Sequence, residues 1–157
     1  MTAKLMEQDH FEVGIAAVAD FAAGDTTSDV VSMKNHNRVR FITHWGVGAT
    51  GIVKLTVLAC DDATPSNTEA VPFTYRITAA GGTPGTPTVT TASAGVSNSA
   101  GSNQIIECEV SAEDLAASGY SYVQLNVDET TDSPLLGGVL VQMGEPRFAN
   151  DPTTATV

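Results

Sequence analysis

Three segments of the sequence alternate between apolar and polar residues with the period of a β-strand. They are NRVRFITHWGVG at 37–48, GIVKLTVLACDD at 51–62 and GGVLVQMGEPRFA at 137–149. Successive side chains of an extended chain point to opposite faces, so strict alternation is typical of a strand with one buried face. In the first segment Val39, Phe41 and Trp45 share one face, whereas Arg38 and Arg40 share the other. The pattern predicts a chain built from half-buried strands.

Length and composition agree with this prediction. A chain of 157 residues suits one domain, and at that size about two-thirds of the surface of the unfolded chain can be buried. Thr, Ser, Gly, Ala and Val dominate, whereas Leu, Lys and Arg are sparse, which favours strands and turns over helices. We therefore expect an all-β, single-domain antiparallel β-sandwich or jelly-roll-like barrel with about eight or nine strands and one short helix.

The order of the elements follows from turn residues. We expect strands over 11–19, 29–33, 38–47, 51–60, 71–78, 86–92, 103–110, 120–129 and 135–143. Ser111 can cap a helix of about two turns that ends at Gly119, with Glu113 and Asp114 in its first turn. The domain spans 11–149, between an N-terminal arm at 1–10 and a C-terminal tail at 150–157.

Two details of the chain path are predicted from the loops. The strands at 38–47 and 51–60 are joined by Gly48, Ala49, Thr50 and Gly51, and glycines in a short loop favour an antiparallel hairpin. The stretch 79–101 contains almost only Ala, Gly, Thr, Pro, Ser and Val, so we expect a flexible, exposed hairpin or flap there.

The inward positions of the expected strands define a hydrophobic core. Its predicted members are Val39, Phe41, Trp45, Val53, Leu55, Val57, Phe73, Tyr75, Ile106, Val123, Leu125, Val139 and Val141.

The net charge of −11 limits the classes of partner. Eighteen acidic residues face seven basic ones, so long-range electrostatics repel phosphate backbones and anionic membranes. We expect no direct nucleic-acid contact and no membrane contact. No segment approaches the ~18 uninterrupted apolar residues of a membrane-spanning helix.

Three of the seven cations, Lys34, Arg38 and Arg40, lie within seven positions. Arg38 and Arg40 project from the same strand face. Two interpretations remain open: a solvated face whose arginines pair with carboxylates on neighbouring strands, and a patch that docks a partner or another subunit.

The sequence contains no convincing catalytic or metal-binding pattern. His10, His36 and His44 are scattered over the expected arm, a turn and a strand, and Cys60 and Cys108 each lie in a strand-like run. Buried free thiols are the expected state of the cysteines, with a single disulfide as the alternative. We expect no enzyme activity, no cofactor and no metal site.

Four segments of the chain follow one another in a distinctive order: RVRFITHWG, VKLTVLACDDATPSNTEAVPFTYR, AEDLAASGYSYVQLNV and GGVLVQMGEPRFA. Together they resemble a family of small virion structural proteins encoded among the head genes of tailed bacteriophages. In that family an arginine-bearing aromatic strand with Trp-Gly is followed by a Pro-Phe-x-Tyr-Arg strand, a Gly-Tyr-x-Tyr-Val strand and a closing Glu-Pro-Arg-(Phe or Tyr)-Ala. The resemblance covers about residues 10–149.

The resemblance implies a virion component, and the acidic composition favours a capsid decoration (cement) protein on the capsid exterior. Its partners would be the major capsid protein and other copies of the chain in a homotrimer, after synthesis in the host cytoplasm. The alternatives are a neck or tail component and a carbohydrate-binding β-sandwich on the virion surface. Candidate docking residues are Arg38, Arg40 and the run Glu145, Pro146, Arg147 and Phe148; equally, this run could merely close the last strand, with Arg147 paired to a carboxylate.

Overall fold

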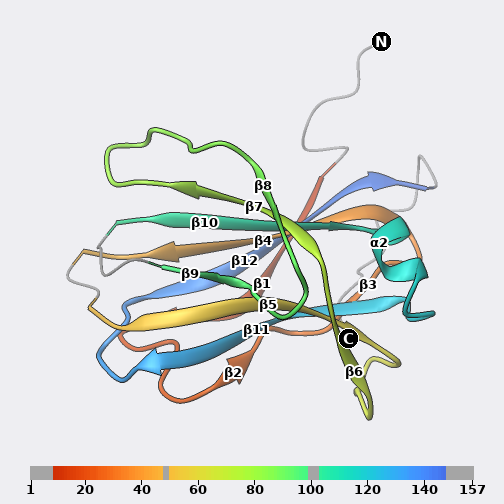
Figure 1. Cartoon of the computed structure of the whole chain (residues 1–157), viewed down its shortest axis with the longest axis horizontal. Helices are drawn as coiled ribbons and strands as arrows, with labels where there is room; N and C mark the ends of the chain where they lie inside the picture. The colour runs from red at the N-terminus through yellow and green to blue at the C-terminus, as the bar shows by residue number, and fades with distance from the viewer. Residues whose placement is uncertain (1–8, 48–49, 99–102, 148–157) are drawn as a thin grey trace.

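Twelve strands form two antiparallel sheets that pack face to face, as a computed structural model of the protein shows for residues 9–47, 50–98 and 103–147 (Figure 1). The all-β prediction is confirmed, and of its two alternatives the sandwich is the observed one. Each of the nine expected strands overlaps an observed one, although the strand expected at 29–33 is only the two-residue Val31–Ser32. The three strands that were not expected are short: Thr26–Thr27, Thr68–Val71 and Val96–Ser97.

The first sheet, called sheet A, has the order β1-β12-β4-β10-β7-β8. Its strands are β1 (His10–Val18), β12 (Gly137–Pro146), β4 (His36–Trp45), β10 (Ile105–Ser111), β7 (Phe73–Thr78) and β8 (Thr88–Thr90). Strands β4 and β12 lie in the interior of the sheet, and β1 and β8 form its edges. β12 runs three residues beyond the expected end at Met143. It therefore pairs with β4 as far as His36 and lies beside both Arg38 and Arg40.

The second sheet, called sheet B, has the order β2-β11-β5-β6, and β3 and β9 add short pairings to β11 and β5. Its strands are β2 (Thr26–Thr27), β11 (Tyr122–Thr131), β5 (Ile52–Cys60), β6 (Thr68–Val71), β3 (Val31–Ser32) and β9 (Val96–Ser97). β5 and β11 pair over almost their full lengths and form the centre of this sheet.

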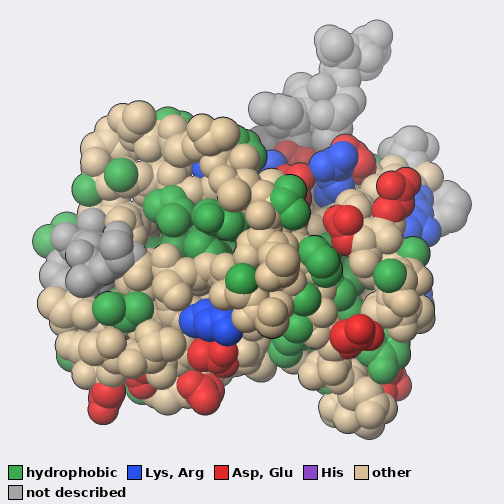
Figure 2. All heavy atoms as spheres, viewed as in Figure 1, with side chains coloured by type: hydrophobic (Ala, Val, Ile, Leu, Met, Phe, Trp, Pro, Cys, Tyr) green, Lys and Arg blue, Asp and Glu red, His purple; other side chains and the backbone are tan. Residues whose placement is uncertain are grey.

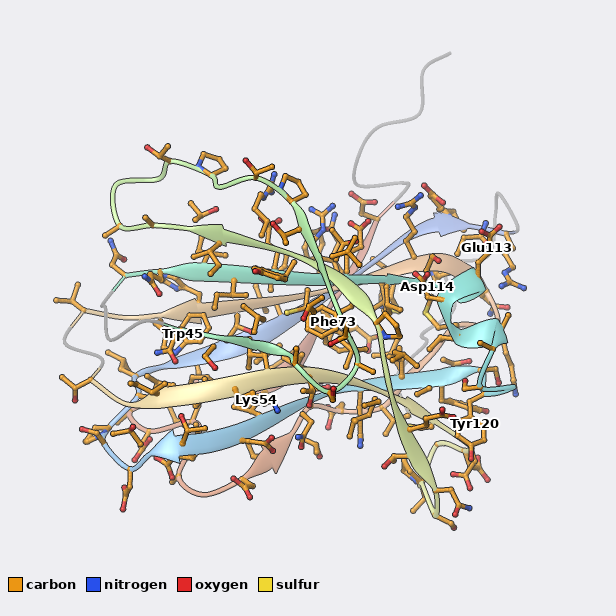
Figure 3. The ribbon with its side chains drawn as sticks, viewed as in Figure 1. Trp45, Lys54, Phe73, Glu113, Asp114 and Tyr120 are labelled. Carbon is orange, nitrogen blue, oxygen red and sulfur yellow. The ribbon has the colours of Figure 1, made fainter. Side chains whose placement is uncertain are left out.

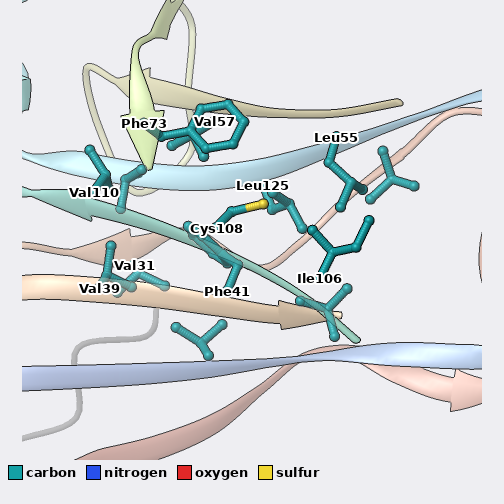
Figure 4. Close-up of a cluster of buried hydrophobic side chains, with 14 of the residues drawn as sticks. Val31, Val39, Phe41, Leu55, Val57, Phe73, Ile106, Cys108, Val110 and Leu125 are labelled. Carbon is teal, nitrogen blue, oxygen red and sulfur yellow. The ribbon is translucent and has the colours of Figure 1, made fainter. Parts of the chain in front are cut away.

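The core lies between the two sheets and matches the predicted list closely. Twelve of the thirteen predicted residues are buried, and Tyr75 is half-buried against the same cluster. Figure 4 shows Phe41, Ile106 and Cys108 of sheet A packed toward Leu55 and Leu125 of sheet B. Period-two alternation was sufficient to predict these positions because each strand buries one face.

The predicted hairpin between residues 38–47 and 51–60 is wrong. β4 pairs with β10 and β12 in sheet A, whereas β5 pairs with β11, β6 and β9 in sheet B, so the chain crosses between sheets at this point. Alternation is the same for hairpin partners and for strands that face each other across a core. Gly51 does not adopt a positive φ; it is needed because a Cβ there would collide with the backbone oxygen of Ser133.

The stretch 79–101, expected to be exposed throughout, is exposed only in its first half. Residues 79–89 are exposed, but the chain then returns to the core with Thr90, Val96 and Asn98 buried. Asn98 hydrogen-bonds the backbone of β5, which anchors the returning segment. Residues 99–101 of the expected flap lie outside the described residues.

The short helix, α2 (Ala112–Ala116), forms where its capping residues predict it. The hydroxyl of Ser111 accepts a hydrogen bond from the backbone N–H of Asp114, and the carboxylate of Asp114 accepts one from the backbone N–H of Ser111. This reciprocal capping box satisfies two backbone donors at the helix start. Figure 3 shows Glu113 and Asp114 at this end of the sandwich, and Gly119 follows with φ 74°.

Candidate interaction surface

The outer face of sheet A brings together charged residues from four adjacent strands. Alternation on β4 buries Val39 and Phe41 and turns Arg38 and Arg40 outward. The neighbouring strands supply the other members. We call the set Arg38, Arg40, Arg76, Glu107, Glu109 and Glu145 the ion-pair network.

Arg40 is the centre of this network. It lies directly opposite Glu109 in the β4–β10 register, and its Nη2 and Nε donate to Glu109 Oε2 at 2.8 and 3.2 Å. Its Nη1 donates to Glu107 Oε1 at 3.2 Å. One guanidinium therefore connects two carboxylates of the same strand.

The network continues to both sides of these two strands. Arg76 on β7 lies opposite Glu107, and its Nε donates to Glu107 Oε2 at 2.6 Å. Arg38 donates to Glu109 Oε1 at 2.9 Å, and its Nε lies 2.8 Å from Glu145 Oε1 on β12. The network side chains are thus acidic on β12, basic on β4, acidic on β10 and basic on β7.

The electrostatic effects of this arrangement are mutual. The hydrogen bond to Glu109 and then that to Glu145 raise the pKa of Arg38. Burial alone would raise the pKa of Glu109, but hydrogen bonds and positive charge from Arg40 and Arg38 outweigh it, so the pKa lies below its ordinary value. Arg38 and Arg40 thus pair with carboxylates on neighbouring strands, as the first of their two interpretations expects. Lys34 does not join them, since its Nζ lies 5.0 Å from the ring centroid of Tyr122.

An exposed group of apolar side chains lies beside the network on the same face. Phe11 and Val13 on β1 and Leu140 on β12 are 55%, 57% and 47% exposed. Val13 is directly opposite Leu140, which is in turn opposite the half-buried Ile42 on β4. We call Phe11, Val13, Ile42 and Leu140 the apolar patch.

The run after Gly144 closes the last strand instead of leaving the domain. Pro146 pairs with His36, and the N–H of Arg147 donates to Asn35 O at 2.9 Å. Arg147 Nε donates to Asn37 Oδ1 at 2.9 Å, so its partner is an amide and not the expected carboxylate. Phe148, the last of the candidate docking residues, lies outside the described residues.

Two histidines that are far apart in sequence lie near each other in the fold. His10 Nε2 is 2.8 Å from Glu12 Oε1 on β1, and His36 is buried at the start of β4. Burial, and then the positive charge of His10, lowers the pKa of His36, while Glu12 opposes the change. Strand pairing through β12 creates this proximity, and sequence spacing gave no signal for it. His44 is exposed, and it is a member neither of this histidine pair nor of the ion-pair network.

The cysteines are as expected. Cys60 and Cys108 are both buried and free. Burial, with a smaller effect of Asp61, raises the pKa of Cys60 to about 11, and burial also raises the pKa of Cys108.

Within residues 9–47, 50–98 and 103–147 no group of three or more His, Cys, Asp or Glu side chains is arranged to hold a metal ion. The described part of the chain also contains no helix with the length and hydropathy needed to cross a membrane.

Acidic side chains outnumber basic ones on the face of the protein shown in Figure 2. They lie along the lower rim and near α2, and lysines and arginines appear at few places. Lys54, labelled in Figure 3, lies on this face, and its Nζ donates to Ser93 O at 2.9 Å.

The protein is an antiparallel β-sandwich in which the outer face of sheet A carries both the ion-pair network and the apolar patch. No protein-family model matches the sequence, and no curated protein matches it. Among solved structures the chain is similar to the SPBc2 prophage-derived protein YomS, at 12% identity and a TM-score of 0.43, covering 87% of this chain and 91% of that one. It is also similar to a structure of infectious bursal disease virus Gx strain, at 13% identity and a TM-score of 0.24, covering 89% of this chain and 42% of that one. No functional residue is transferred from either.

Proposed function

We propose that this protein is a structural component of a tailed-bacteriophage virion, and specifically a capsid decoration protein that binds the outside of the major-capsid lattice. The sequence resemblance to head-gene structural proteins supports the first part. The sandwich fold, the acidic surface and the mixed apolar and charged face of sheet A support the second.

One observation carries the proposal. Four charged residues from three of the segments that resemble the phage family are far apart in sequence, yet they meet on one surface. Arg38 and Arg40 come from RVRF, Arg76 from PFTYR and Glu145 from GEPRF. The motifs therefore specify one fixed outer face of sheet A, which is the behaviour expected of a structural module.

The acidic surface suits a position on the capsid exterior. A protein there contacts other proteins and has no need to neutralise phosphate charge. Contacts between adjacent protein surfaces need only shape and charge complementarity, which a rigid sandwich with a mixed face provides.

Copy number tests the proposal and separates it from the neck or tail alternative. Quantitative mass spectrometry of purified virions that carry this gene should find hundreds of copies per particle, since a decoration protein follows the lattice. A dozen copies or fewer would instead indicate a neck or tail component. Absence from the particle would contradict both.

Capsid binding is tested by adding the purified protein to capsids that lack it. We expect saturable binding, and a reconstruction of the decorated particle should place the protein at repeated lattice positions, three copies around each local threefold axis. We also propose the ends at 1–8 and 150–157 as anchors, because contacts spread over several neighbouring subunits would make release slow. Deleting residues 1–8 and, separately, 150–157 should then weaken binding. If both truncated proteins bind like the full chain, the folded body makes the contact.

A further inference from the structure

His36 is a buried titratable side chain whose ring is not fully hydrogen-bonded. It begins β4, is 3% exposed, and its Nδ1 has no hydrogen-bond partner among the residues that the structure describes. A neutral imidazole can leave Nδ1 without a proton, whereas a protonated imidazole carries a donor at both nitrogens. Protonation of His36 would therefore bury both a positive charge and an unpaired N–H donor, and each is unfavourable away from water.

The start of β1 places a second titratable group near this ring. His10 Nε2 is 2.8 Å from Glu12 Oε1, and the side chain of Glu12 is only 12% exposed. Burial lowers the pKa of His36, the positive charge of His10 lowers it further, and Glu12 acts in the opposite direction. The neutral form of His36 is therefore the form that fits the folded protein.

Charged side chains on the other elements around His36 have partners of their own. They are Asp9 with Gln142, Lys34 with Tyr122, Arg38 with Glu109 and Glu145, and Arg147 with Asn37. Within the described part of the chain, the charges that change the pKa of His36 are those of His10 and Glu12. Glu12 already bonds to His10, so it offsets the cost of protonating His36 only in part.

The stretch of β1 that carries His10 and Glu12 has few attachments. β1 is an edge of sheet A, and among the described strands it pairs with β12 alone. Residues 10–13 pair with β12 in regular register, which is interrupted between Val13 and Ile15. At the interruption Gly14 O accepts a hydrogen bond from the N–H of Asp29 at 3.0 Å, so a second segment holds the chain from there. Such an edge stretch can open while the rest of the domain stays folded.

We propose that His36 and the His10–Glu12 pair form an acid-sensitive switch, in which protonation of His36 releases residues 10–13 from β12 while both sheets remain folded. Release admits water to the ring of His36 and separates its positive charge from that of His10. The proposal concerns the free protein and does not depend on a role in a virion.

The pH range of the switch follows from the direction of the pKa change. The pKa of His36 in the folded state lies below the ordinary value of 6.5, so the neutral ring stabilises the closed state above pH 6.5. This stabilisation is lost as the pH falls from 6.5 through the folded pKa. The range lies above that of Glu109, whose ordinary pKa is 4.5.

Hydrogen exchange followed by NMR on the full chain tests the switch between about pH 8 and about pH 5, the range in which histidines titrate. After correction for the effect of pH on intrinsic exchange, the hydrogen-bonded amides of residues 10–13 should lose protection several-fold as the pH falls. The imidazole resonances of His36 should titrate over the same range as this loss. Amides at the centre of β5 and β11 should keep their protection.

Three variants assign the response to its residues. His36→Gln removes the titrating ring and should abolish the loss of protection. The matched control His44→Gln removes an exposed histidine from the same strand and should leave the loss unchanged. His10→Gln should reduce the loss, because a charge that disfavours protonated His36 is gone.

Unchanged protection of residues 10–13 across the pH range in the wild type would overturn the proposal. A folded His36→Gln protein with the wild-type loss would also overturn it. So would a simultaneous loss of protection in every strand, since that indicates global unfolding. If His36→Gln does not fold, the wild-type protein alone decides, because different midpoints for the His36 imidazole and for the exchange of residues 10–13 would contradict the switch.

Discussion

Asn98 bonds to Val53 and thereby fixes the start of β5. The side-chain oxygen of Asn98 accepts a hydrogen bond from the N–H of Val53 at 2.8 Å, and its Nδ2 donates to Gly51 O at 3.0 Å. Asn98 is 3% exposed, and Val53 is fully buried. One side chain thus satisfies two backbone groups at the point where the chain enters sheet B.

Replacing Asn98 by Ala should destabilise the domain. A buried backbone group that loses its hydrogen-bond partner costs about 1–3 kcal/mol, and this change affects two such groups. Denaturant unfolding should show a lower midpoint. The matched control is Ser97→Ala, an exposed neighbour in β9, which should shift the midpoint little. An Asn98→Ala protein as stable as the wild type would mean that water replaces the amide without cost.

Exchanging the charges of Arg40 and Glu109 tests the centre of the ion-pair network. Arg40→Glu alone should lower the free energy of unfolding by about 1 kcal/mol, because like charges directly opposite each other in a sheet repel. Glu109→Arg alone should also destabilise the domain. The double exchange should recover part of the loss. Additive effects in this double-mutant cycle would show that the two residues do not interact in solution.

Acid should weaken the domain through Glu109. Its folded pKa lies below the ordinary value of 4.5, so the ionised carboxylate stabilises the folded state above that pH. This stabilisation is lost as the pH falls from about 4.5 through the folded pKa. Thermal melts of Glu109→Gln should therefore show a weaker loss of stability over this range than the wild type. Glu69→Gln, at an exposed position in β6, should behave like the wild type.

Truncating Phe41 tests the core between the sheets. Its side chain is fully buried, and loss of a buried phenylalanine ring typically costs 3–5 kcal/mol, so we expect Phe41→Ala to lower the free energy of unfolding by about that much. The control Val47→Ala removes an exposed side chain and should change stability by less than about 0.5 kcal/mol. A small effect at Phe41 would contradict the predicted burial.

The two thiols should be unreactive in the folded protein. Cys60 and Cys108 are buried, and burial raises the pKa of both, to about 11 for Cys60, so few thiolates form near pH 8. A thiol reagent should label neither residue in the native state and both in denaturant. Because the pKa of Cys60 is raised in the folded state, its neutral thiol favours folding. This contribution to the free energy of unfolding is fully present below the ordinary pKa of 9.0 and is lost as the pH rises toward 11. Rapid labelling of one equivalent in the native state would contradict this prediction.

Much of the fold could be predicted from local patterns. Alternation along β4 identified Val39, Phe41 and Trp45 as buried and Arg38 and Arg40 as outward. The serine and acidic residues at 111–114 predicted α2 through their capping chemistry. These features depend on residues within a few positions of one another, and the sequence contains that information directly.

The candidate surface could be predicted only in part. The sequence identified outward arginines on β4 and the run at 145–148 as candidate docking residues, but it did not reveal their partners within the fold. Glu107 and Glu109 are separated from Arg40 by more than sixty positions, and only the β4–β10 register brings them together. The patch of Phe11, Val13 and Leu140 likewise exists only because β1 pairs with β12.

By itself the sequence determined which residues are extended, which face of each strand is apolar, and where the helix begins, because period-two alternation and capping are local properties of the chain. Only the tertiary structure decided that β4 and β5 lie in different sheets, that residues after 89 return to the core, and that four strands contribute to one ion-pair network. The physical reason is that alternation specifies the buried face of a strand but not its neighbour. Neighbours are selected by the packing of both sheets around one shared core.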